Sequence, residues 1–287
     1  MSPCAQVLTS IVRRMRPAWV FNAQEARLEH FVSIVKNYDL LCLQEVTLFW
    51  GGDAPAEFIR GAAFAHGLRF STSSGRWPCL PSILATSGLV VLSRYPIVKT
   101  RVLHFSLQAW FEWSVVKRGA IMVELQRPDG VKIAVLNAHT TAGQEVLDSG
   151  VGHKAKLRRT NPIGLDQLNE ALDEFHEFSR ASTHKILCGD FNLQKGSDAF
   201  KALQAKASSL GLRDCFPDSP ATFGCSDEPL ETLLTKLADR NSQKTIDHVF
   251  SNIDCSAARV EALAAPPESQ AGFQQVSDHR AIAVTWS

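Results

Sequence analysis

The sequence predicts a single α/β domain with mixed sheets and long loops on one side. Strand-like and helix-like stretches alternate along its 287 residues, and no repeat or low-complexity segment interrupts them. Hydrophobic residues make up 45% of the chain and charged residues 21%, the balance of an ordinary globular protein with a sizeable core. Nothing in the composition marks a boundary, so we expect one domain over residues 1–287.

The first half of the chain predicts one helix and two strands. Residues 27–38 place apolar side chains at helical spacing, and residues 39–46, "DLLCLQEV", predict a buried strand directly after them. Residues 88–97, "GLVVLSRYPI", predict a strand that runs into a proline turn. The apolar residues of the helix are Leu28, Phe31, Ile34 and Val35.

The rest of the chain predicts a hairpin, a long helix and three further strands. Residues 120–125 and 131–139 are apolar runs joined by "QRPDG", a turn signal, and therefore predict the hairpin. Residues 164–180 have the pattern of an amphipathic helix, and the strand "KILC", residues 185–188, follows it. The strands that close the chain are residues 245–250 and 281–286.

Two long stretches, residues 140–162 and 219–242, carry no periodic pattern. Loops of this length inside a compact domain are typically functional lids or disordered segments, and the sequence leaves both roles open.

The charge balance restricts the class of protein. A net charge of +1 provides no strong field toward nucleic acid, which counts against a nuclease without excluding one. No apolar run approaches the ~20 residues of a membrane-spanning helix. The basic cluster at residues 13–16 follows the short apolar stretch instead of preceding it, unlike a signal peptide. We expect a cytoplasmic protein whose membrane contact, if it has any, is peripheral.

The seven cysteines include no CxxC pair. Cys42 and Cys188 lie in apolar strand-like runs, where a reduced cysteine behaves as a small hydrophobic residue. This pattern predicts a reducing compartment and no disulfide framework.

Polar residues interrupt the predicted strands near their C-terminal ends. Strand residues i and i+2 share a face, so we expect Asp190 and Asn192 to point the same way, with Phe191 turned into the core. One such residue alone is usually a turn or cap residue, but strand ends of α/β folds converge on one edge, so five interruptions predict a shared site. The polar residues are Glu45, Asn137, His139, Asp190, Asn192, Asp247, Asp278 and His279.

The types of these residues indicate metal-assisted hydrolysis. Carboxylate and amide oxygens without a cysteine or histidine cluster suit a hard divalent cation such as Mg²⁺. Two histidines, one of which an aspartate can orient, supply acid–base catalysis and a hydrogen-bond donor to developing charge. Together they describe metal-assisted attack of water on a phosphorus ester.

The order of the motifs resembles that of the endonuclease/exonuclease/phosphatase superfamily over residues 39–286. The stretches that carry the resemblance are "LQEV", "NAH", "GDFN", "IDHVF" and "SDH". The resemblance implies a deoxyribonuclease-like fold, a four-layered α/β sandwich in which helices flank two mixed β-sheets. It also implies Mg²⁺-dependent hydrolysis of phosphate esters.

The resemblance assigns the metal and positioning residues. Glu45 resembles the principal Mg²⁺ ligand, and Asp278 would complete the polar shell near the metal or its waters. Asp190 and Asn192 resemble the pair that positions the attacking water and the scissile phosphate.

The same resemblance assigns the proton transfers. His279 resembles the general base that deprotonates the attacking water, and Asp247 would orient it through a hydrogen bond. His139 would donate a hydrogen bond to a phosphoryl oxygen as charge develops in the in-line reaction.

The first strand departs from the superfamily pattern. Members usually carry an Asn there that supports the metal site, whereas "VLTSIV", residues 7–12, places Ile11 at this position. Three interpretations follow: the strand lies elsewhere, Asn22 substitutes, or the metal site is weakened. A catalytically inactive relative with the same fold is one consequence of the last.

Within the superfamily, the middle of the chain is most similar to neutral sphingomyelinases, which hydrolyse sphingomyelin to ceramide and phosphocholine. The similar stretches are residues 87–97, residues 117–140 and the helix that contains Gln167. Arg118 occupies the position of a Lys that pairs with an upstream Asp in that family. Glu112 lies one residue out of register with that Asp, which leaves the regulatory pairing in doubt.

The segment "SLQAWFEWSVV" places Trp110, Phe111 and Trp113 close together. These residues form either an aromatic core patch or a loop that inserts into lipid headgroups, and in the second case Trp110, Trp113 and Arg118 bind substrate. The basic stretch at residues 154–159 fits a solvated loop, anionic lipid or nucleic acid alike.

The predicted partner is therefore a phospholipid membrane surface or another phosphodiester substrate, with nucleic acid as the alternative and no obligate protein partner. Two other functions stay open, a nuclease of the same superfamily and a non-catalytic protein that binds phospholipid or nucleic acid.

Overall fold

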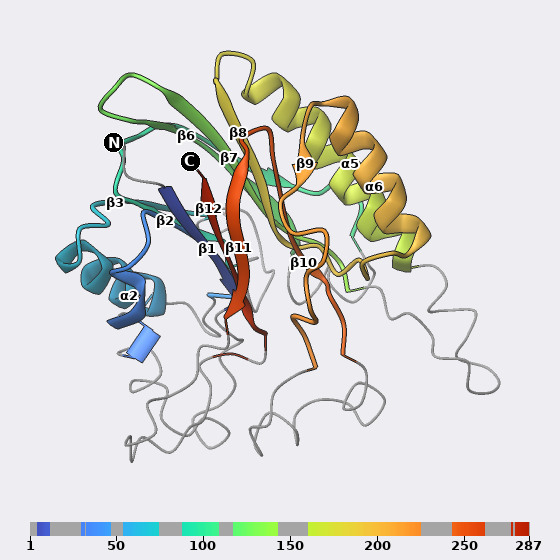
Figure 1. Ribbon diagram of the computed structural model, residues 1–287, viewed down its shortest axis with the longest axis horizontal. Helices are drawn as coiled ribbons and strands as arrows, with labels where there is room; N and C mark the ends of the chain where they lie inside the picture. The colour runs from blue at the N-terminus through green and yellow to red at the C-terminus, as the bar shows by residue number, and fades with distance from the viewer. Residues whose placement is uncertain are drawn as a thin grey trace.

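Two six-stranded sheets pack face to face in the computed structural model, and helices cover their outer faces (Figure 1). The predicted four-layered α/β sandwich is confirmed. None of the described helices is both long and apolar enough to cross a membrane. The structure describes residues 5–11, 30–31, 33–46, 54–74, 88–108, 117–142, 160–224, 243–261, 277 and 279–286.

The first sheet, called sheet I, has the strand order β11-β12-β1-β2-β4-β3. In sheet I, β1 runs parallel to β2, and its other neighbour β12 is antiparallel. Helix α2 (Ala54–Ala65) lies outside this sheet (Figure 1). The strands are β1 (Ala5–Ile11), β2 (Leu40–Gln44), β3 (Phe70–Ser73), β4 (Val90–Ser93), β11 (Cys255–Glu261) and β12 (Ala281–Trp286).

The second sheet, called sheet II, has the order β5-β6-β7-β8-β10-β9. β7 and β8 run parallel, and the remaining neighbours are antiparallel. Helices α5 (Thr160–Phe178) and α6 (Asp198–Ser209) lie side by side on its outer face (Figure 1). The strands are β5 (Ile97–His104), β6 (Gly119–Gln126), β7 (Lys132–His139), β8 (His184–Asp190), β9 (Arg213–Asp214) and β10 (Asp247–Ser251).

Strand periodicity divides the core into three layers. In β2, Leu41 and Leu43 pack outward with α2, whereas Leu40 and Cys42 pack into the space between the sheets. Because successive strand residues point to opposite faces, a strand covered on both sides must be apolar throughout. This is why the central strands were predictable from continuous apolar runs.

The elements that the sequence did not predict lie mostly toward the edges of the sandwich. They are α2, α6, β3, β5, β9 and β11. Strand β5, for example, exposes Lys99 and Arg101, so its pattern does not resemble that of a core strand. Helix α5 begins at Thr160, four residues before the predicted start, and shortens the expected irregular segment at residues 140–162.

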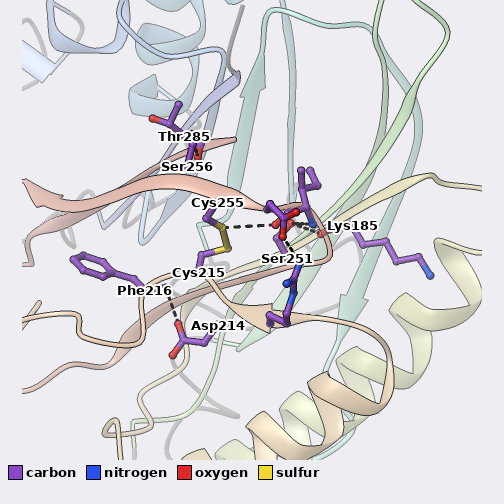
Figure 2. Close-up of a disulfide and its surroundings, with 11 residues drawn as sticks. Lys185, Asp214, Cys215, Phe216, Ser251, Cys255, Ser256 and Thr285 are labelled. Carbon is purple, nitrogen blue, oxygen red and sulfur yellow. Dashed lines mark hydrogen bonds and ion pairs between the residues drawn. A yellow bond between two sulfur atoms is a disulfide. The ribbon is translucent and has the colours of Figure 1, made fainter. Parts of the chain in front are cut away.

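A disulfide joins Cys215 and Cys255, so the expectation that the cysteines form no disulfide is wrong for this pair (Figure 2). Their Cα atoms are 5.8 Å apart, an ordinary separation for bonded cysteines. Cys215 follows β9 at the edge of sheet II, and Cys255 begins β11 at the edge of sheet I. The bond therefore connects the two sheets. Cys42 and Cys188 are buried and free, as predicted.

Replacing both Cys215 and Cys255 by Ser should lower the free energy of unfolding by about 2–4 kcal/mol, because the bond closes a loop of 40 residues. Urea unfolding followed by circular dichroism measures the change. Wild-type protein in reductant should behave like the double variant. An unchanged midpoint for both would contradict the structural role of the bond.

Candidate active site

The site lies where the facing surfaces of the two sheets change from apolar to polar. On β8, Ile186 and Cys188 pack between the sheets, and Asp190 continues the same strand face. On β10, Val249 packs between the sheets and Asp247 lies two residues before it. The polar residues therefore occupy the end of the intersheet layer, and most of their surface is buried.

Directly beneath the site, two buried amides connect the sheets. Gln44 Nε2 of β2 donates to Asn137 Oδ1 of β7 at 2.6 Å, and Asn137 Nδ2 donates to the carbonyl of Leu43 at 3.0 Å. Asn137 was grouped with the predicted site residues, but it is completely buried and bonded to sheet I. It supports the site rather than lining it.

Asp190, Asp247 and His279 converge on one point. The β8–β10 register places Asp190 opposite Asp247. One ligand atom from each of the three residues lies within 4.8 Å of the other two. His279 Nδ1 lies 2.9 Å from Asp247 Oδ2, so Nδ1 carries the proton and Nε2 is left as the acceptor. The predicted Asp247–His279 pairing is present in the structure.

Asn192 is held beside Asp190, but not by the expected strand geometry. Strand β8 ends at Asp190, and Asn192 has a left-handed backbone with φ 49°, a conformation that Asn tolerates better than most residues. Its backbone N–H donates to Asp190 Oδ1 at 2.9 Å, and its Nδ2 donates to the carbonyl of Thr140 at 3.0 Å. Phe191 is buried in the core, as predicted.

Glu45, His139 and Arg118 form the opposite wall. Glu45 follows β2 with a left-handed backbone, φ 56°. Its Oε1 lies 3.6 Å from Arg118 Nη1 and 3.8 Å from His139 Nε2. Arg118 Nη1 contacts both ring nitrogens of His139 and is 2.7 Å from Nδ1, while Nε2 lies 3.3 Å from Asp190 Oδ2. His139 thus joins the two carboxylates.

Burial sets the protonation of two of these groups. It lowers the pKa of His139 well below the ordinary value, and the Arg118 guanidinium lowers the pKa further. His139 is therefore neutral near pH 7. Because a guanidinium only donates, the ring nitrogen that accepts from Arg118 is the unprotonated one. Burial also raises the pKa of Asp190, against the opposing effect of His279.

The cluster fits a hard divalent cation. Asp190 and Asp247 are both buried and lie opposite each other, and two adjacent buried carboxylates are costly unless positive charge or hydrogen bonds compensate them. Glu45 adds a third carboxylate on the other side of His139. Mg²⁺ prefers such oxygen ligands, usually one or two carboxylates with several waters.

The structure excludes one of the three interpretations of Ile11, namely that the first strand lies elsewhere. β1 ends at Ile11, which pairs with Gln44 immediately before Glu45, so the first strand lies where the sequence placed it. Isoleucine in place of the usual Asn has no oxygen that could serve as a metal ligand. Asn22, the proposed substitute, lies outside the described residues.

Several predicted residues also fall outside the part of the chain that the structure describes. They are Asp278, Trp110, Trp113, Phe111 and Glu112, with the basic stretch at residues 154–159 and most of residues 140–162 and 219–242. The roles predicted for them stay predictions.

Sequence reasoning missed the residues that hold the site in place. Gln44 and Thr141 bond to segments remote in sequence, Gln108 bonds Arg118 across the intervening segment, and Gln167 was noted only as part of a resemblance. Gln44 precedes a recognisable Glu and interrupts an apolar strand, which was a usable signal. The other residues have no local pattern that distinguishes them from surface amides.

Carboxylates, an oriented histidine and a neutral histidine at the open end of two stacked sheets define a hydrolase site of the phosphoester class. The chain belongs to the Endonuclease/Exonuclease/phosphatase family, whose sequence model it matches over residues 19–279. Members of this family are hydrolases that act on phosphodiester bonds. No curated protein sequence matches the chain.

Solved structures share the fold at low sequence identity. Sphingomyelinase C from Streptomyces griseocarneus has a TM-score of 0.74 and 18% identity, with 100% of both chains covered. A Staphylococcus aureus beta toxin mutant with bound magnesium ions has a TM-score of 0.72 and 17% identity, covering 99% of this chain and 100% of that one. D. rerio TDP2 complexed with single-strand DNA product has a TM-score of 0.66 and 12% identity, covering 99% of each.

Gly189→Ala should destabilise the protein by about 3 kcal/mol or more and displace Asp190, because a Cβ at residue 189 would lie 2.0 Å from the carbonyl oxygen of Ala138. Gly196→Ala is the matched control. Its φ is also positive, but a Cβ there meets open space, so about 1 kcal/mol is expected. Chemical unfolding of both variants provides the comparison, and equal losses would contradict the close approach of β7 and β8.

Proposed function

We propose that the protein is a Mg²⁺-dependent phosphodiesterase that hydrolyses sphingomyelin to ceramide and phosphocholine. The observation that carries the reaction class is the convergence of Asp190, Asp247 and His279 on one point beside His139. The sphingomyelin assignment is supported by the motif order and by the full-length likeness to a sphingomyelinase.

In the proposed mechanism, His279 is the general base. Asp247 accepts a hydrogen bond from Nδ1–H, so Nε2 is the nitrogen that would take a proton from the attacking water. The ring is oriented further by packing against Phe223, 4.8 Å between ring centroids, and by the bond from its backbone N–H to Ser277 Oγ. The water attacks phosphorus in line with the leaving group, the bond from phosphorus to the ceramide oxygen breaks, and ceramide departs with a proton taken up from solvent. Asp190 and Asn192 position the water and the scissile phosphate.

The opposite wall would bind the phosphoryl group. Neutral His139 would donate a hydrogen bond from its ring N–H to a phosphoryl oxygen as charge develops there, in place of its contact with Asp190. Arg118 lies behind the ring and adds a fixed positive charge. Arg118 therefore belongs to the proposed substrate-binding residues.

Glu45 and Asp190 would hold Mg²⁺, with Asp278 near the metal or its waters. The ion supplies a Lewis acid that polarises the phosphoryl oxygens. The likeness to a beta toxin with bound magnesium ions supports this choice of cation.

Trp110 and Trp113 are proposed to contact the lipid. They follow Leu107, whose apolar side chain is exposed. Amphipathic aromatic rings favour the headgroup region of a bilayer. A cytoplasmic location and a single domain over residues 1–287 stay predictions.

A nuclease of the same family is the second candidate. The likeness to TDP2 complexed with single-strand DNA product favours it. A non-catalytic relative is the third, because Ile11 replaces a residue that supports the metal site.

Purified protein should release phosphocholine from sphingomyelin vesicles with Mg²⁺ and lose this activity in EDTA, because the carboxylates need the cation to act on a phosphodiester. A plasmid-nicking assay runs in parallel. Nicking without phosphocholine release would move the protein to the nuclease candidate. No activity in either assay, with Mg²⁺ binding absent by calorimetry, would support the non-catalytic candidate.

His279→Ala should lower kcat by about 100-fold or more while the fold is retained, because a general base contributes about 10²–10⁴-fold. Asp190→Ala should lower kcat by a similar factor, because Asp190 would position the attacking water and the scissile phosphate. His184→Ala is the control, since His184 lies on the same strand as Asp190 but at its opposite end. Steady-state kinetics and circular dichroism give the two readouts. Wild-type kcat in His279→Ala would show that the assigned base is wrong.

A further inference from the structure

Gln167 of α5 is a buried amide that bonds to two segments at the border of the site. Its Oε1 accepts from the backbone N–H of Thr141 at 2.8 Å. Its Nε2 donates to Thr141 Oγ1 at 2.9 Å and to the carbonyl of Leu107 at 2.7 Å. The side chain is completely buried and its two bonds to Thr141 are buried, while the bond to Leu107 is partly buried. Losing a buried bond leaves a buried polar group without a partner.

One of these segments leads to Asn192. Thr141 follows Thr140, whose carbonyl accepts from Asn192 Nδ2 at 3.0 Å. Thr140 also donates from its backbone N–H to the carbonyl of Asp190 at 3.1 Å and from Oγ1 to the carbonyl of Phe191. Residues 140–141 therefore run across the end of β8, and the position of the Asn192 amide depends on them.

The other segment leads to Arg118. Leu107 precedes Gln108, whose Oε1 accepts from the backbone N–H of Arg118 at 3.0 Å. Gln108 Nε2 donates to the carbonyl of Arg118 at 2.9 Å and to that of Phe105 at 3.0 Å. The Arg118 backbone is thereby fixed by residues 105–108, and its side chain contacts His139 and Glu45.

We propose that Gln167 is a positioning residue that couples the two walls of the site, keeping Asn192 and Arg118 at a fixed separation. It reaches no reacting atom and acts only through Thr141 and Leu107. Anchoring α5 does not require it, because Leu168, Leu172 and Phe175 already bury the helix against sheet II. This inference rests on the proposed function for its catalytic consequence and on the hydrogen bonds alone for its structural one.

Gln167→Met tests the proposal, because Met has a similar length and no strong hydrogen-bonding group. A displacement of catalytic groups by about 1 Å is enough to lower the rate about 100-fold. We therefore expect kcat to fall about 100-fold at saturating Mg²⁺, with KM within about threefold of the wild-type value. The substrate is sphingomyelin vesicles or plasmid DNA, whichever the wild-type protein hydrolyses. Glu177→Ala is the control: Glu177 lies near the C-terminal end of α5 and pairs with Arg180, away from both segments.

A double-variant cycle separates positioning from general destabilisation. If Gln167 acts through Asn192, Gln167→Met should lower kcat by a much smaller factor in an Asn192→Ala background than in the wild type. The same loss in both backgrounds, or a loss no greater than the unfolded fraction measured by circular dichroism, would overturn the proposal.

Hydrogen exchange tests the coupling without any activity. In Gln167→Met, amides in residues 105–108 and 140–142 should exchange faster than in Glu177→Ala, and those of β10 should not change. Unchanged exchange in either segment overturns the coupling. Faster exchange in both segments of a protein that hydrolyses neither substrate would support the coupling and reject the proposed function.

Discussion

The packing of the two sheets against each other is the interaction on which the rest of the molecule depends. Side chains alternate along each strand, so the residues that face the opposite sheet are apolar in the interior and polar at one end, as Ile186, Cys188 and Asp190 show on β8. A one-residue shift of register would turn Asp190 toward the helices. The positions of the site residues are therefore set by the backbone hydrogen bonds between the strands. Gly189 permits the close approach of β8 to β7 that this pairing requires.

Gathering carboxylates in this layer is energetically unfavourable, and the surrounding polar groups compensate the cost. Asp190 accepts a backbone hydrogen bond from Asn192 and faces His139, and Asp247 is bonded by His279. Left-handed backbone at Glu45 and Asn192 costs on the order of 1–3 kcal/mol each and aims these residues at the cluster. The three apolar clusters supply the opposing stabilisation. Strain concentrated beside buried charge is the pattern expected of a functional site.

The hydrophobic pattern of the sequence predicted the central strands and the long helix well. The central strands are buried on both faces and are apolar throughout, and the helix buries one apolar face against sheet II. It did not predict edge strands such as β5, whose exposed face carries Lys99 and Arg101. It also gave no indication of the disulfide, since Cys215 and Cys255 become neighbours only when the edges of sheets I and II meet. The relation between Asp190 and Asn192 was expected for the wrong reason: the strand ends first, and a turn brings the two residues together.

The sequence by itself determined the chemistry: which carboxylates, amides and histidines follow the core strands, and hence the phosphoester-hydrolase family. Only the tertiary structure decided which of them line the site and which support it. Asn137 and His139 are two residues apart on one strand, yet Asn137 bonds across to Gln44 beneath the site while His139 lies within it. The physical reason is that these roles depend on hydrogen bonds between segments distant along the chain. Periodicity records which face a residue occupies, but not what lies opposite that face.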